Sequence, residues 1–175
     1  MNSSAAENST GATCEFTQNL EILRRIDFFA GLPIETLKLF AYLCERETFG
    51  AGDYLFTQDE DDGQALYLIS GQALLVHAAE DGELQVRQLG PGEFLGGLSL
   101  LGNMPRLFSL KATAEVACLV LTREKFTKAI TQFPDLIPRL FKSVVEGIRS
   151  WEKHCLFELK EKGLSLEGLT GISAI

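Results

Sequence analysis

The sequence predicts a mainly β protein with flanking helices, an α+β arrangement. We expect an antiparallel jelly-roll barrel, a pair of N-terminal helices and a long C-terminal helix. Three observations lead to this fold class. Short apolar segments with period-two alternation fill the middle of the 175-residue chain. Glycines separate these segments at the short intervals typical of a sandwich or barrel. Segments with helical periodicity precede and follow them.

The N-terminal segment 1–17 consists of small and polar residues and has almost no large apolar residue before Phe16. Such a segment buries too little apolar surface to offset the entropy of ordering it, so we expect it to be disordered. Apolar residues recur at helical spacing from Gln18 to Phe29. Pro33 suits the first turn of a second helix. A domain over residues 18–134 therefore begins with two helices.

Six segments have the pattern of short strands: residues 53–56, 65–69, 73–79, 84–89, 107–112 and 116–121. Asp81-Gly82 separates the third from the fourth. This dipeptide favours a two-residue hairpin turn, because both central residues of that turn need a positive φ. After the last strand, Thr122 suits the N-cap of a helix that Pro134 ends.

A longer helix is predicted over residues 135–162. Its apolar residues follow one another at intervals of 4, 3, 4, 3 and 4, which defines an a/d seam of Ile137, Phe141, Val144, Ile148, Trp151 and Cys155. This seam either packs on the barrel of its own subunit or forms the interface of a homodimer. The apolar tail 163–175 is interrupted by glycines, and its large residues are candidates to pack into a pocket or onto a partner.

Composition limits the possible partners. The formal net charge of −8 and the lack of a basic run disfavour direct DNA binding. No apolar run is long enough to span a bilayer, so we expect no membrane partner. The four cysteines lack the spacing of a zinc site or a disulfide framework, which favours a cytoplasmic protein. No catalytic pair or dinucleotide fingerprint is recognisable, so we expect no enzyme activity.

The candidate functional site lies between Gly90 and Ala112. Glycines bring backbone N–H groups close to a ligand. The N–H groups at the start of a short helix over residues 97–101, together with the guanidinium of Arg106, are suited to bind a phosphate. The predicted ligand contacts of this small phosphate pocket are Gly96, Gly97, Leu98, Ser99, Arg106, Leu107 and Ser109. The acidic run 59–62 is expected to be a solvated loop.

This stretch resembles the phosphate-binding cassette of the cyclic nucleotide-binding domain family, which includes the catabolite-activator-like sensors. The positions that match or nearly match are Phe94, Gly96, Leu98, Leu100, Leu101, Pro105, Arg106 and Ser109. Residues 52–71 resemble the family's Gly-Asp, acidic loop and Leu-Tyr-x-Ile arrangement. Gly97 departs from the pattern, since the family has a glutamate there that accepts from the ribose 2′-hydroxyl. Leu107 and Phe108 replace two small alanines.

The resemblance implies a non-catalytic sensor of a cyclic nucleotide, cAMP or cGMP, or of another small phosphorylated ligand. The sensor would act on an unidentified effector protein through its C-terminal helix, and it would be a homodimer. No cofactor other than such a ligand is implied.

Loss of the glutamate's hydrogen bond, worth about 1.5–3 kcal/mol, would weaken binding by about tenfold to a hundredfold. Gly97→Glu would then restore affinity. Arg106 has an alternative role, in which it caps a loop carbonyl or pairs with a loop carboxylate such as Glu93. The alternative for the whole domain is a degenerate, ligand-free scaffold for protein interaction or dimerisation.

Overall fold

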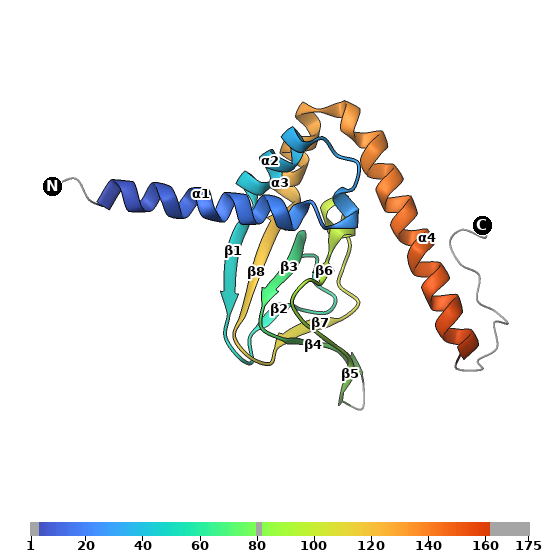
Figure 1. Cartoon of the computed structure of the whole chain (residues 1–175). Coiled ribbons are helices and arrows are strands. Elements are labelled where there is room, and N and C mark those ends of the chain that lie inside the picture. Colours follow the sequence, from blue (N-terminus) through green and yellow to red (C-terminus); the bar gives the residue numbers. More distant parts are fainter. Residues whose placement is uncertain (1–3, 80–81, 162–175) are drawn as a thin grey trace.

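A computed structural model describes residues 4–79 and 82–161 of the chain. Two β-sheets form a barrel, a helical layer covers one end of it, and the last helix runs down one side (Figure 1). The predicted jelly-roll class is therefore confirmed. The elements in chain order are α1 (Ser4–Leu23), η1 (Asp27–Phe29), α2 (Ile34–Leu43), β1 (Glu45–Phe49), β2 (Tyr54–Phe56), β3 (Gln64–Ser70), β4 (Ala73–Ala79), β5 (Gly82–Leu89), β6 (Phe94–Leu95), η2 (Gly97–Leu100), β7 (Ser109–Ala112), β8 (Val116–Thr122), α3 (Arg123–Gln132), η3 (Pro134–Leu136) and α4 (Ile137–Glu161).

Each sheet has four antiparallel strands. The orders are β1-β8-β3-β6 and β2-β7-β4-β5. The predicted hairpin is confirmed, because β4 pairs with β5, but Gly82 is the first residue of β5 and lies opposite Ala79, so it is not a central residue of the turn as expected. Apolar side chains that alternate along the strands fill the space between the sheets, and they include Leu66, Leu68 and Leu110.

Two strands were not predicted, and a third is shorter than expected. β1 has the sequence Glu-Arg-Glu-Thr-Phe and lies at a sheet edge, where only Phe49 packs against the core. β6 has two residues and is followed directly by Gly96. β7 begins at Ser109, so Leu107 and Phe108 lie in the loop before it. Short or edge strands carry too little apolar alternation to be recognised in the sequence.

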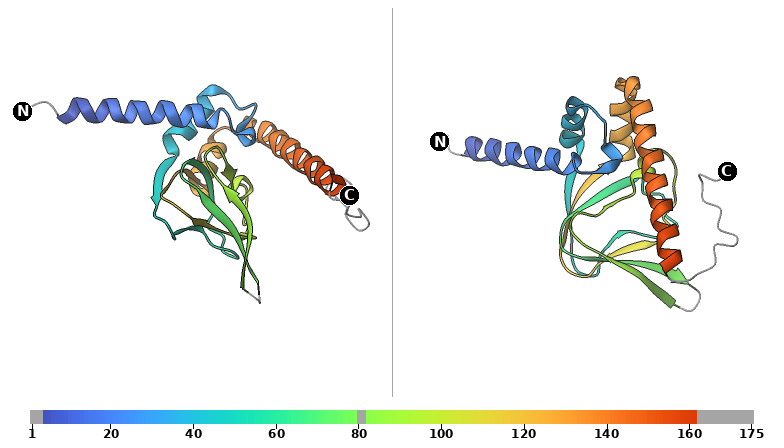
Figure 2. Two further views of the ribbon diagram at one scale, coloured as in Figure 1. Left: turned by 60° about the horizontal axis from the view of Figure 1, so that its bottom comes forward. Right: turned by 45° about the vertical axis from the view of Figure 1, so that its right-hand side comes forward.

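The prediction of a disordered segment over residues 1–17 is wrong from Ser4 onward, where α1 begins. Alanine and glutamate have high helix propensity, and Phe16 packs against the helical core, which gives the helix a tertiary anchor. α1 points away from the barrel (Figures 1 and 2). The first predicted helix also ends early, because α1 stops at Leu23 and residues 27–29 form the separate turn η1.

An aromatic cluster holds the helical layer together. Phe40 of α2 and Phe126 of α3 stack with ring centroids 5.4 Å apart and an interplanar angle of 11°. Phe29 of η1 contacts Phe40 on one side and Phe94 of β6 on another. The cluster therefore joins the N-terminal turns to the barrel.

Thr122 caps α3 as predicted, since its side chain accepts from the N–H of Lys125.

The start of α4 is fixed on the loop that follows η1. In α4, the Ser143 hydroxyl donates to the Ala30 carbonyl at 2.6 Å, and Leu140 is buried. Leu136 of η3 is also buried. The tail 163–175, for which packing into a pocket or onto a partner was considered, lies outside the described residues.

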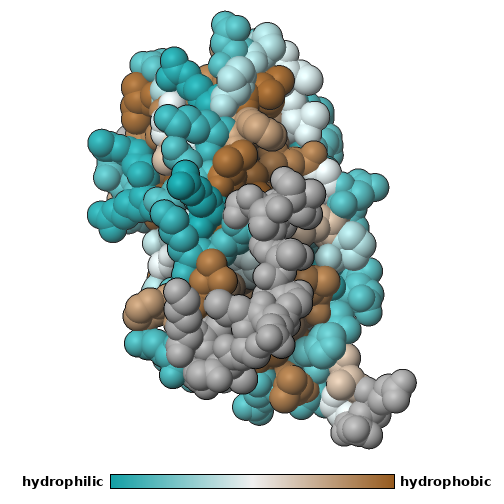
Figure 3. All heavy atoms as spheres, turned by 90° about the vertical axis from the view of Figure 1, so that its right-hand side faces the viewer, coloured by the Kyte–Doolittle hydropathy of each residue, from teal (hydrophilic) through white to brown (hydrophobic). Residues whose placement is uncertain are grey.

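The a/d seam of α4 is only partly covered within the subunit. Ile137, Phe141 and Trp151 are 52%, 69% and 62% exposed, and the other three seam residues are half-buried. Figure 3 shows apolar patches on the face of the molecule where α4 lies. Leu140 and Ser143 are buried in the subunit and lie outside the seam. Within residues 4–79 and 82–161, none of the helices has the length and apolarity needed to cross a membrane.

We expect Phe40→Ala to lower the free energy of unfolding by about 3–5 kcal/mol, because Phe40 is fully buried and stacked on Phe126. Tyr42→Ala is the matched control, since Tyr42 lies in the same helix but is 79% exposed and should change stability by less than about 0.5 kcal/mol. Urea denaturation followed by circular dichroism measures both. Equal losses in the two variants would contradict the aromatic core.

Candidate functional site

A cavity of about 250 Å³ opens where the loop around Arg106 meets the sheets. Eight of its twelve lining residues are apolar, two are glycines, and Arg106 is its one charged lining residue. The lining residues are Phe56, Leu75, Leu95, Gly96, Gly97, Leu98, Ser99, Met104, Pro105, Arg106, Leu107 and Phe108. Six of the seven predicted contacts therefore meet at one cavity. Ser109 is not among the residues that line it.

Gly96 brings β3, η2 and Arg106 together. Its φ is 77°, in the left-handed region, and it is the N-cap residue of η2. A Cβ at this position would lie 2.4 Å from the carbonyl oxygen of Gln64 and 2.5 Å from Nη1 of Arg106. Any side chain here would displace the guanidinium or the strand, so the close approach requires glycine.

Gly97 sits against two aromatic rings. A Cβ here would lie 2.9 Å from a ring carbon of Phe28 and 2.9 Å from one of Phe94. The space next to position 97 is therefore filled from the N-terminal turn η1 and from β6. The expectation that Gly97→Glu would restore affinity does not hold in this packing, because both rings would have to move first.

Arg106 is paired with a carboxylate of the acidic loop. Its Nη2 lies 2.7 Å from Oδ1 of Asp62 and its Nε 3.2 Å from Oδ2, so the pair is bidentate. Nη2 also donates to the Gln64 carbonyl at 2.7 Å, and the guanidinium carbon lies 4.3 Å from the centre of the Phe56 ring. Arg106 is 8% exposed and Asp62 19%. The pair is partly buried and little screened by salt.

The loop carboxylate that Arg106 pairs with is Asp62, and Glu93, named as a candidate from the sequence, pairs with Arg87 instead. The other sequence-based alternative, capping of a loop carbonyl, occurs together with this pairing at Gln64. Main-chain bonds add to the contact, because Asp59 N–H donates to the Arg106 carbonyl at 2.8 Å and Arg106 N–H donates to the Glu60 carbonyl at 2.9 Å. The acidic run is thus only partly the solvated loop that was expected.

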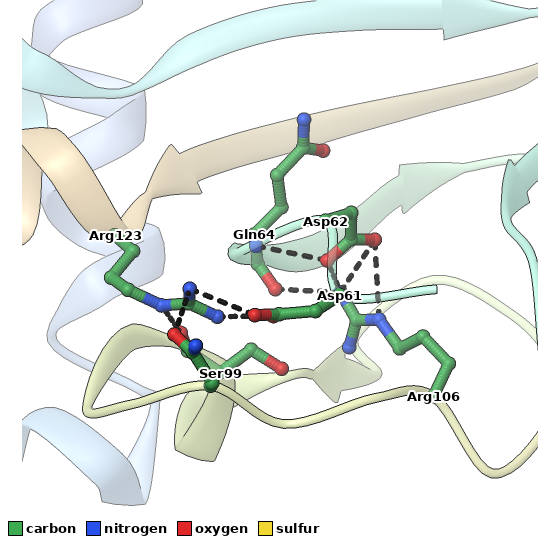
Figure 4. A network of polar contacts seen from close by, with 7 residues as sticks. Asp61, Asp62, Gln64, Ser99, Arg106 and Arg123 are labelled. Carbon is green, nitrogen blue, oxygen red and sulfur yellow. Dashed lines mark hydrogen bonds and ion pairs between the residues drawn. The ribbon is translucent and has the colours of Figure 1, made fainter. Parts of the chain in front are cut away.

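Asp61 holds a second arginine beside the first (Figure 4). Arg123, at the start of α3, donates to both carboxylate oxygens of Asp61 and, through Nε, to the Ser99 carbonyl at 2.6 Å. The hydrogen bonding of Arg123 to the Asp61 carboxylate is the main reason that the pKa of Asp61 is lowered. A lowered pKa in the folded state stabilises the fold above the unfolded pKa of about 3.9, and the contribution is lost as pH falls through the folded value.

Two of the predicted contacts, Ser99 and Ser109, make hydrogen bonds within the protein. The Ser99 N–H donates to the Gly96 carbonyl at 3.0 Å within the turn of η2. The Ser109 hydroxyl accepts from the Gln58 N–H at 2.9 Å, which connects β7 to the loop after β2. Ser109 is therefore a structural residue here and not a wall of the cavity.

Sequence reasoning missed the apolar walls from the strands, Phe56, Leu75 and Leu95, and it missed the role of Asp62. The walls come from three strands that are far apart in the sequence, so only the fold brings them together. The sequence signal that could have pointed to Asp62 is the glycine that follows it. Gly63 has a φ of 62° and lies directly before β3, so it marks a turn of the loop at Asp62.

The arrangement suits reversible binding. The walls offer apolar contact, η2 presents the first N–H groups of a short helix, and Arg106 supplies one guanidinium. No cluster of histidine, cysteine or acidic side chains among the described residues is arranged to hold a metal ion.

We expect Gly97→Ala to destabilise the protein by about 1–3 kcal/mol, because the added methyl group collides with Phe28 and Phe94. Gly102→Ala is the matched control, since a Cβ there meets no atom within 4 Å. Thermal unfolding of the two variants measures the difference. A Gly97→Ala variant as stable as Gly102→Ala would show that the rings do not fill this space.

Comparison with known proteins agrees with this geometry. A family profile described as "Cyclic nucleotide-binding domain" matches residues 46–133, half of the chain. The cGMP-dependent protein kinase egl-4 of Caenorhabditis briggsae is 30% identical over 118 residues, which are 65% of this chain and 16% of the kinase. The cGMP-dependent protein kinase 2 of Homo sapiens is 27% identical over 122 residues, 68% of this chain and 16% of that kinase. The chain thus matches about one sixth of the length of these relatives.

Solved structures show the same fold. The N-terminal domain of a transcriptional regulator from Streptomyces coelicolor A3(2) superposes with a TM-score of 0.67 at 26% identity, over 77% of this chain and 94% of that one. The profile spans the barrel and α3, including η2, Arg106 and the two aspartates that pair with arginines, Asp61 and Asp62. The chain therefore belongs to the cyclic nucleotide-binding domain family.

Proposed function

We propose that this chain is a non-catalytic regulatory sensor that binds a cyclic nucleotide, cAMP or cGMP, or a similar small phosphorylated ligand, with weak affinity. The observation that carries the proposal is the cavity itself, where Gly96, η2 and Arg106, which resemble parts of the family's phosphate-binding cassette, lie together. Weak affinity follows from Gly97, which has no side chain to meet a ribose hydroxyl, and from the rings beside it, which occupy the space.

The proposed signal leaves the cavity through the helical layer. Ser99 at the cavity is bonded to Arg123 of α3, and Phe28 and Phe94 connect Gly97 to η1, on which α4 is fixed. A shift of η2 on ligand binding would thus alter the contact of α4 with the loop that follows η1. The target of this proposed signal would be an effector protein. The absence of a basic run disfavours DNA as that target, and the cysteine pattern favours a cytoplasmic partner.

The second candidate function is a ligand-free scaffold that dimerises or binds a protein through α4. The observation in its favour is the exposure of Phe141 and Trp151 on the seam. Both candidates share a homodimer formed by two copies of this seam, which supplies apolar residues at a/d spacing. Ligand binding separates the two candidates, and the state of association tests the seam.

Calorimetric titration with cAMP and cGMP, at low salt and high protein concentration, tests the sensor. We expect saturable heat with the wild-type chain and at least about tenfold weaker binding in Arg106→Ala, because a charge-assisted contact is lost. Arg87→Ala is the matched control: it removes the same charge from an exposed arginine outside the cavity and should bind as the wild type does. No saturable heat with either nucleotide would favour the scaffold.

Sedimentation of wild type and Phe141→Asp tests the seam. We expect the wild type to sediment as a dimer of the 19.3 kDa chain and Phe141→Asp as a monomer, because a buried, unpaired carboxylate opposes association. Phe141 is 69% exposed in the single subunit, so the substitution should leave the subunit folded. Ser150→Asp places the same charge on the opposite side of α4 and serves as the control. Equal masses for all three chains would rule out the seam.

A further inference from the structure

We propose that a second cavity, where η1 meets the outer face of β3 and β6, binds a small zwitterionic aromatic compound of the aromatic amino-acid class. The cavity has a volume of about 470 Å³, which is within the range of small-molecule sites. Among the described residues, none lines both this cavity and the cavity of Arg106. The second site is therefore separate from the proposed nucleotide site, and the inference does not depend on the proposed function.

Aromatic rings form the walls of the second cavity. Tyr67 of β3 lies opposite Phe94 of β6, so their side chains are on the same face of the sheet. This face is the outer one, because both residues pack against the helical core, whereas their neighbours Leu66 and Leu95 belong to the core between the sheets. Phe28 of η1 adds a third ring, with its centroid 5.9 Å from that of Phe94. Such walls favour a flat aromatic group on the ligand.

The polar side chains of this cavity are not used by the fold. Arg25, Asp27 and Tyr67 line the cavity, and within residues 4–79 and 82–161 their guanidinium, carboxylate and hydroxyl groups have no hydrogen-bond or ion-pair partner. The adjacent arginine differs, since Arg24 pairs with Glu21 at 2.9 Å. A guanidinium and a phenol can donate to a ligand carboxylate, and a carboxylate can accept from a ligand ammonium group.

The two opposite charges decide the class of ligand. An aromatic anion would bind near Arg25 but would bring a like charge to Asp27, and an aromatic amine would bring a like charge to Arg25. A neutral aromatic compound would contact the walls alone. A free aromatic amino acid offers a carboxylate for Arg25, an ammonium group for Asp27 and a ring for the aromatic walls, so it satisfies all three features together.

The second cavity adjoins the first through two shared rings. Phe28 and Phe94 line the second cavity, and a Cβ at Gly97 would lie 2.9 Å from each of them. Gly97 in turn lines the cavity of Arg106. A ligand that packs on these rings therefore changes the surroundings of Gly97 without entering the first cavity.

Calorimetric titration of the full-length chain with L-phenylalanine tests the second site. We expect saturable binding to the wild type and binding about threefold to tenfold weaker in Arg25→Gln and in Asp27→Asn, because each variant loses one charged contact that water partly screens. Arg24→Gln is the matched control. It removes the same charge from the adjacent arginine, which does not line the cavity, and should change the affinity by less than about twofold.

Two analogues assign the charges. 3-Phenylpropionate lacks the ammonium group, so Asp27→Asn should not weaken its binding; 2-phenylethylamine lacks the carboxylate, so Arg25→Gln should not weaken its binding. In ¹⁵N-labelled protein, L-phenylalanine should shift the amide resonances of Phe94 and Gly97 and leave that of Gly102 unchanged. Absence of saturable L-phenylalanine binding to the wild type would overturn the inference. Equal affinities for wild type, Arg25→Gln and Asp27→Asn would also overturn it, as would resonance shifts confined to Leu98, Met104 and Leu107 of the first cavity.

Discussion

The ion pair between Arg106 and Asp62 holds together the end of the barrel that carries the candidate site. Arg106 is the charged lining residue of the cavity and is 8% exposed. A guanidinium so placed needs a compensating partner, because a buried unpaired charge is strongly unfavourable. Asp62 and the Gln64 carbonyl supply that compensation, and the main-chain bonds of Asp59 and Glu60 hold the loop against Arg106. The acidic loop, β3 and the loop before β7 therefore form one unit.

A second constraint links this unit to the helices. Gly97 allows Phe28 and Phe94 to approach η2 at distances that any side chain would prevent. Phe28 belongs to η1, and the loop after η1 accepts the Ser143 hydroxyl of α4. Asp61 adds another connection through Arg123 to α3. Aromatic packing therefore occupies the space beside position 97 and connects Gly97, a lining residue of the cavity, to the helical layer.

The fold class, the hairpin of β4 and β5 and the Thr122 cap follow from local patterns, so they could be predicted from the sequence. Six of the seven predicted site residues meet at the cavity for the same reason, since they lie in one continuous stretch. Residues 4–17 of α1, β1 and Asp62 could not be predicted. Each depends on a partner that is distant in the chain: the helical core for Phe16, β8 for β1, and Arg106 for Asp62.

The placement of charge also decides what can drive ligand binding here. In a phosphate site, an unpaired guanidinium attracts the ligand, and its charge is satisfied only when the ligand binds. Here that charge is satisfied before any ligand arrives, while apolar surface remains exposed at Leu98, Met104 and Leu107. Burial of this apolar surface contributes favourable free energy to ligand binding, in addition to any contact that a ligand makes with Nη1 of Arg106. A ligand that separated Arg106 from Asp62 would also disturb the loop whose neighbouring residue, Asp61, holds α3.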